Sequence, residues 1–72
     1  MILIKIISKS GEAIVPLESS IVTHNYKTGY TTFSSLNGNV LISAKIDYGE
    51  FVSDMFNVVS HGYSGVHKYE EL

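Results

Sequence analysis

Residues 45–56 read "KIDYGEFVSDMF", and within this stretch the spacing of apolar residues changes. Upstream, apolar and polar residues alternate, as they do in strands. From position 48 the apolar residues recur every three or four positions, which predicts an amphipathic helix over residues 48–59. Asp47 is a suitable N-cap residue, and Glu50 occupies the third helical position, as in a capping box. Gly62 is a suitable residue to end the helix. The expected apolar face comprises Tyr48, Phe51, Val52, Met55, Phe56 and Val59.

Three turn signals precede this helix, at residues 9–12, 26–30 and 37–38, and they predict hairpins. Asn37-Gly38 is the strongest, because both central residues of a type I′ turn need positive φ. The expected cross-strand pairs are Leu36 with Asn39, Ser35 with Val40, Phe33 with Ile42 and Thr31 with Ala44. This register places Phe33, Val40, Ile42 and Ala44 on one apolar face.

The first strand is apolar on both faces. Its alternation places Ile2, Ile4 and Ile6 inward, with Leu3 and Ile7 on the opposite face. A strand with two apolar faces is expected to be covered on both sides, here by a partner chain. Residues 65–72 are expected to add a short strand or to fray. The sequence thus predicts an α+β fold, with a small antiparallel sheet of about five strands and one C-terminal amphipathic helix.

Length and composition point to one small domain over residues 1–72. A chain of 72 residues has a marginal core and usually needs a disulfide, a metal or a partner chain. The sequence contains no Cys, so we expect a homodimer to supply the missing burial. No apolar run is long enough to span a bilayer, and the opening "MILIKII" is too short for a signal peptide. We therefore expect a cytoplasmic protein.

Charge is divided unevenly along the chain, whose net charge is −2. Residues 1–45 carry four Lys and two Glu, whereas residues 46–72 carry one Lys and five carboxylates. The sequence contains no Arg, which is the usual partner of phosphates and guanine. A nucleic-acid partner is therefore disfavoured.

No residue pattern indicates catalysis or a cofactor. The segment "HGYSG" at residues 61–65 lacks the spacing of a nucleophile elbow. His24, His61 and His67 do not have the spacing of a zinc motif. The carboxylates of the predicted helix lie on an exposed face, where the pKa values of an acid–base pair are not driven apart. We expect a protein that is not an enzyme and that holds neither metal nor cofactor.

The helix carboxylates are the functional candidates. Asp47, Glu50 and Asp54 are spaced by three and four positions, so they lie along one helix face. With Glu70 and Glu71 in support, they are interpreted as an anionic surface that binds a basic protein partner. In a dimer such a surface would resemble the phosphate backbone of DNA. Small, Cys-free, β-rich chains of this kind occur among phage proteins that inhibit a host factor.

Two alternatives remain open at this point. One is a small nucleic-acid-binding regulator that uses Lys5, Lys9, Lys27, Lys45 and the five Tyr residues. The other is a structural oligomerisation module without a separate ligand.

Short segments resemble two known families. The opening "MILIKIISKSGEAIV" is similar to that of the carbon-storage-regulator family of dimeric RNA binders, and "GVHKYEEL" resembles its later Val-His-Arg-Glu-Glu segment. Lys68 stands where that family has an RNA-contacting Arg, and Ile6 and Ile7 replace its basic residues. The hairpin followed by a helix is similar to the flagellar FlbD-like pattern. Because of these departures, no functional residue is carried over from either family.

Overall fold

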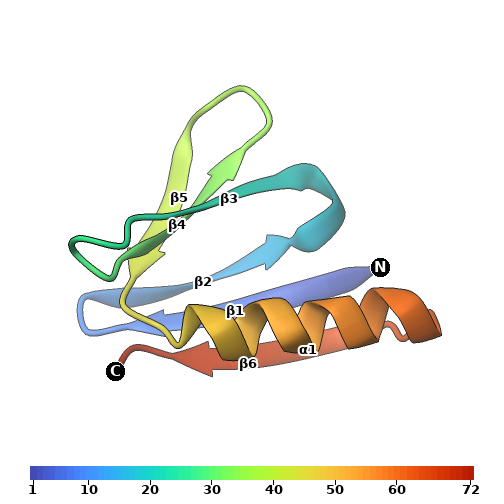
Figure 1. The fold of residues 1–72 in the computed structure, drawn as a ribbon. Coiled ribbons are helices and arrows are strands. Elements are labelled where there is room, and N and C mark those ends of the chain that lie inside the picture. Colours follow the sequence, from blue (N-terminus) through green and yellow to red (C-terminus); the bar gives the residue numbers. More distant parts are fainter.

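The computed structural model describes all of residues 1–72 and confirms the α+β class (Figure 1). Six strands form two three-stranded sheets, ordered β2-β1-β6 and β3-β4-β5, rather than one sheet of about five strands. The elements in chain order are β1 (Ile2–Ser8), β2 (Gly11–Pro16), the 3-10 turn η1 (Leu17–Ser19), β3 (Ser20–His24), β4 (Thr31–Ser35), β5 (Val40–Ala44), α1 (Tyr48–His61) and β6 (Gly65–Glu70).

The first sheet is mixed. β1 pairs antiparallel with β2 and parallel with β6, so residues 65–70 form a strand and do not fray. A parallel partner cannot follow through a tight turn, and α1 lies in the connection that leads into β6. The inward face of β1 is the predicted one, with Ile2, Ile4 and Ile6 all buried.

The chain leaves the first sheet at Pro16, which has no N–H to continue a ladder. Two hydrogen bonds then hold η1 in place: Ile2 N donates to Glu18 Oε1 at 3.0 Å, and Ser20 Oγ donates to the Pro16 carbonyl. The next strand starts in a new direction and pairs with β4 instead of β2. This bend is the reason for two sheets.

The β4–β5 hairpin keeps most of the expected register but not the expected turn. Phe33 faces Ile42 as predicted, whereas Val40 pairs with Ser34 and not with Ser35. Ser35 N donates to Asn39 O at 2.8 Å, and within this turn only Gly38 has positive φ, at 92°. The loop therefore has three residues, as in a type I turn followed by a left-handed glycine, and a bulge follows it. The bulge turns Val40 outward, so the predicted core position of Val40 is wrong.

The core lies between the two sheets and α1. Phe33 and Ala44 of the second sheet are fully buried beside the isoleucines of β1, and the Phe33 and Phe51 rings meet edge to face at 5.5 Å. In β3, Val22 packs against this cluster. All ten buried apolar residues form one cluster. No helix of the structure has the length and apolar character to cross a bilayer.

Glu71 and Leu72 join the two sheets after β6 ends. Glu71 N donates to Ile7 O at 2.8 Å, and Leu72 N donates to Lys45 O at 2.7 Å. The Glu71 carboxylate accepts from Lys9 N at 2.7 Å and from Lys45 N at 3.0 Å. These bonds connect the β1–β2 turn to the segment that follows β5.

Candidate protein-binding surface

The first carboxylate of α1 caps the helix, as the sequence predicts. The Asp47 side chain accepts a hydrogen bond from Glu50 N at 3.0 Å. Such a bond satisfies one of the free N–H groups of the first turn, and the negative charge suits the positive end of the helix dipole. At the other end, Gly62 adopts a left-handed conformation with φ of 69°, and its N–H donates to Val59 O at 3.3 Å. The helix continues to His61, two residues beyond the predicted range.

Asp54 connects α1 to β6. Its carboxylate accepts a hydrogen bond from the Tyr69 hydroxyl at 2.8 Å, and both side chains are half-buried. Burial raises the pKa of Tyr69 above its usual value, and the Asp54 hydrogen bond and the charges of Asp54 and Glu50 raise it further. Tyr69 therefore remains protonated and keeps donating to Asp54 throughout the physiological pH range.

Glu50 lies on the same flank of α1 as Asp54. It precedes Asp54 by four positions, so the two carboxylates lie along the same side of the helix, and the Glu50 side chain is exposed. We call Asp47, Glu50 and Asp54 the acidic edge of α1. The structure places all three along this helix, as the sequence predicts, but two of them also make hydrogen bonds within the fold.

Glu70 and Glu71 do not join the acidic edge. Glu70 alternates with Tyr69 and so projects from the face of the first sheet opposite α1, where it pairs with Lys68 at 3.4 Å. Glu71 is engaged with the backbone amides of Lys45 and Lys9, and these hydrogen bonds lower the pKa of its carboxyl below the usual value. Its local role is structural.

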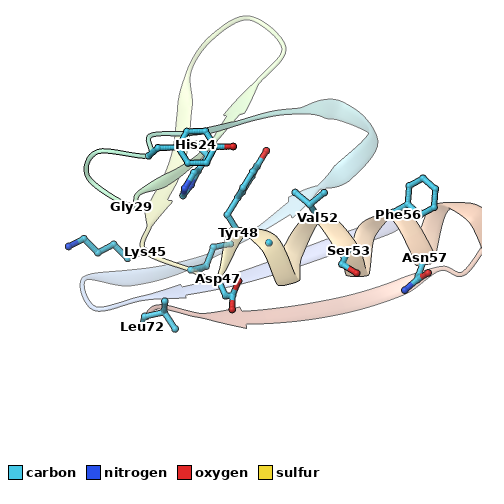
Figure 2. Close-up of a pocket in the computed structure, with 13 residues that line it drawn as sticks. His24, Gly29, Lys45, Asp47, Tyr48, Val52, Ser53, Phe56, Asn57 and Leu72 are labelled. Carbon is cyan, nitrogen blue, oxygen red and sulfur yellow. The ribbon is translucent and has the colours of Figure 1, made fainter.

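The opposite flank of α1 is apolar and uncovered. Tyr48, Val52 and Phe56 follow one another at intervals of four residues, and the Tyr48 side chain points toward His24 (Figure 2). The exposed fraction is 47% for Val52, 73% for Phe56 and 62% for Val59. We call Val52, Phe56 and Val59 the apolar flank. Two of its residues, Val52 and Phe56, line an open groove of about 910 Å³ between α1 and the β3–β4 connection.

Stacked aromatic rings form one end of this groove. The His24 ring lies parallel to Tyr48 at 4.3 Å between centroids, and Tyr26 meets His24 edge to face at 4.8 Å. His24 Nδ1 is 2.9 Å from the hydroxyl oxygen of buried Thr31, which fixes the orientation of the imidazole. Tyr26 is 84% exposed and stands at the rim. The sequence does not predict this aromatic cluster, because β3 and α1 come together only in the folded protein.

The part of α1 that packs against the sheets is narrower than the apolar face predicted from the sequence. The buried residues are Phe51, Met55 and Val58, so the expectation that Val52, Phe56 and Val59 belong to the core is wrong. The six apolar residues of the predicted face span roughly 140° of the helix circumference, and only part of this arc reaches the sheets. The spacing of four and three positions between Phe51, Met55 and Val58 was the signal for the buried arc.

Basic and metal-binding groups are not concentrated around α1. Lys5 pairs with Glu12 at 3.9 Å on the outer face of the first sheet, and Lys45 Nζ lies 5.3 Å from the Tyr30 ring centroid. No three potential metal ligands come together. The Nε2 atom of His67 is buried without a hydrogen-bond partner.

No family model, curated protein or solved structure matches this chain. The similarity to the carbon-storage-regulator family therefore remains a likeness of short segments. The functional argument rests on the geometry of α1 and its surroundings.

Proposed function

We propose that this chain is a non-enzymatic protein-binding module whose acidic edge attracts a basic protein. The partner class that suits it is a DNA-binding or nucleoid protein, which the module would occupy in competition with DNA. This is the mode of action of a small phage-type inhibitor that works in the host cytoplasm. Asp47, Glu50 and Asp54 are the proposed contacts, and Glu70 and Glu71 add negative charge at longer range.

The observation that carries this proposal is the amount of α1 left uncovered. The helix buries three residues and exposes Val52, Phe56 and Val59, with carboxylates along the opposite flank. Large apolar side chains gathered on a surface are typical of protein interfaces, and charges beside them steer a partner of opposite sign.

The structure also shows which of the three helix carboxylates should be replaced to test the proposal. Replacing Asp47 or Asp54 by Lys would remove a helix cap or the bond to Tyr69, so a loss of binding would be ambiguous. Glu50 has an exposed side chain, and its carboxylate makes no hydrogen bond within the fold. Glu50→Lys is therefore the informative change. Glu12→Lys is its matched control, because it makes the same change in net charge on the far face of the first sheet.

The test is displacement of a fluorescent DNA duplex from a purified bacterial nucleoid protein. We expect the wild-type chain and Glu12→Lys to displace the duplex, and Glu50→Lys to need at least about tenfold more protein. Absence of displacement by the wild-type chain, or equal displacement by Glu50→Lys and the wild type, would contradict the proposal.

A further inference from the structure

The turn between β4 and β5 places an asparagine side chain beside a backbone nitrogen that nothing shields. Asn37, Gly38 and Asn39 are all exposed, and a Cβ added at Gly38 would meet no atom within 4 Å. Because glycine has no side chain, its nitrogen is the least hindered one that can follow an asparagine. In this setting the side-chain amide of the asparagine is open to attack by the next backbone nitrogen, which is one reason that asparagine is a thermolabile residue.

The fold also supplies a hydrogen-bond donor to the oxygen of that side-chain amide. The Ser35 hydroxyl donates to Asn37 Oδ1, and Asn39 N donates to the Ser35 hydroxyl oxygen at 3.2 Å. A hydroxyl that accepts one hydrogen bond donates another more strongly, so this chain of bonds draws electron density from the Asn37 carbonyl. Cγ of Asn37 is therefore more electrophilic, and the same donor stabilises the negative charge that develops on Oδ1 during attack.

One backbone hydrogen bond opposes the attack. Gly38 N donates to Ser35 O at 3.0 Å, and this bond must open before the nitrogen can turn toward Cγ of Asn37. Residues 36–40 are all exposed, so opening the bond disturbs no core contact. Rotation about ψ of Asn37 moves the nitrogen and leaves the side-chain bond from Ser35 in place.

The other three asparagines lack this combination. The Oδ1 atom of Asn25 accepts two backbone amides of its own turn, which hold the side chain in place, and a tyrosine follows it. Asn39 and Asn57 each precede a valine, whose branched side chain crowds the nitrogen. Asn57 also lies within α1, where turning the next amide would break the helix. Asn37 is therefore the asparagine that the fold leaves most reactive.

We propose that Asn37 is a site of spontaneous modification, where the chain converts this residue into aspartate and isoaspartate with water as the only co-reactant. Gly38 N loses its proton to the solvent and forms a bond to Cγ of Asn37. The bond between Cγ and Nδ2 breaks, and Nδ2 takes up a proton and leaves as ammonia, so a five-membered succinimide remains. Water then opens the ring. Opening at Cγ gives aspartate, whereas opening at the backbone carbonyl carbon gives isoaspartate.

Either product changes the charge or the length of the turn. Both gain a carboxylate, so the net charge of −2 becomes more negative by one unit. Isoaspartate also adds a methylene to the backbone of a loop whose ends are joined by the bond from Ser35 N to Asn39 O at 2.8 Å. This loop lies at the end of the β4–β5 hairpin that points away from α1 (Figure 1). The modification is therefore independent of the proposed function and is tested with the purified chain alone.

Mass spectrometry of the aged chain tests the site. The protein is held at pH 8 and then cleaved after lysine, which places Asn25 and Asn57 in different peptides from Asn37. We expect Asn37 to convert over days and Asn39, the matched control in the same loop, to convert at least about tenfold more slowly, a difference of about 1.4 kcal/mol in activation free energy. Equal conversion of Asn37 and Asn39, or no conversion of Asn37, would overturn the proposal.

The ratio of the two products tests the chemistry. Isoaspartate, separated from aspartate by chromatography of the peptides, arises only through the succinimide, because direct hydrolysis of the side-chain amide leaves the backbone unchanged. We expect both products at position 37. Aspartate alone would contradict attack by the Gly38 nitrogen.

Two variants of Ser35 test the hydroxyl donor. Ser35→Ala removes the donor to Asn37 Oδ1, and we expect conversion in the folded chain to slow at least about threefold, in line with the net effect of one hydrogen bond. Ser35→Thr keeps a hydroxyl and should keep the wild-type rate. In urea, where the turn is absent, the three chains should convert equally fast. A folded Ser35→Ala chain that converts as fast as the wild type would overturn the role of this hydroxyl.

Discussion

At the scale of single residues, the carboxylates of this chain have different local roles. Asp47 caps α1, Asp54 holds Tyr69, and Glu71 accepts two backbone amides, whereas Glu50 makes no such bond through its side chain. The sequence indicated the type and spacing of the helix carboxylates but not their long-range partners. Tyr69 and Lys9 come close to the carboxylates of Asp54 and Glu71 only in the folded protein, so no local sequence pattern predicts these hydrogen bonds.

Glu71→Gln tests the bond network that joins the two sheets. The folded-state pKa of Glu71 lies below its usual value of 4.5, because Lys45 N and Lys9 N donate to the carboxylate. A lowered pKa adds stability above about pH 4.5, and this contribution is lost as the pH falls through the folded-state value. We therefore expect Glu71→Gln to melt several degrees below the wild type at pH 7 and to approach it at pH 3. Thermal melts with an equally large gap at both pH values would contradict this role.

Tyr69→Phe isolates the bond between β6 and α1. The ring is kept and only the hydroxyl that donates to Asp54 is removed. We expect a loss of about 1 kcal/mol in the free energy of unfolding, measured by urea titration. In Asp54→Asn, the same Tyr69→Phe change should cost clearly less, because the charge-assisted bond is already absent. An equal cost in both backgrounds would indicate that the hydroxyl acts through another contact.

At the scale of elements, the spacing of apolar residues predicts that α1 forms but not which of its sides is buried. Its existence, its N-cap and its Gly62 stop followed from local signals. The side of the helix that faces the core did not follow from these signals, because six apolar residues left it undetermined. The β4–β5 hairpin behaves similarly: the position of the turn was predicted, but its three-residue loop and bulge were not.

Two adjacent valines test the orientation of α1. Val58 is buried in the core, whereas Val59 is mostly exposed. Val58→Ala should lower the free energy of unfolding by about 2 kcal/mol, since two methyl groups leave the core. Val59→Ala should change it by less than about 0.5 kcal/mol. Urea titrations with equal losses for both variants would show that the helix is rotated from the orientation described here.

At the scale of the whole molecule, the two sheets depend on contacts between distant segments. β6 pairs with β1 across more than fifty residues, and a parallel pair of this kind has no turn signal in the sequence. The departure of β3 from the first sheet follows from Pro16 and η1, and the turn signals in the sequence do not predict this change of sheet. This arrangement covers one arc of α1 and leaves the rest exposed.

The central claim is that the exposed part of α1 binds protein. The most direct measurement is a nuclear magnetic resonance titration of the isotope-labelled chain with an unlabelled bacterial nucleoid protein. We expect amide shifts to change mainly in residues 47–60 and little in the β4–β5 loop, residues 36–39. Glu50→Lys should reduce these changes and Glu12→Lys should retain them. Shifts concentrated in residues 36–39, or no shifts at any ratio, would contradict the claim.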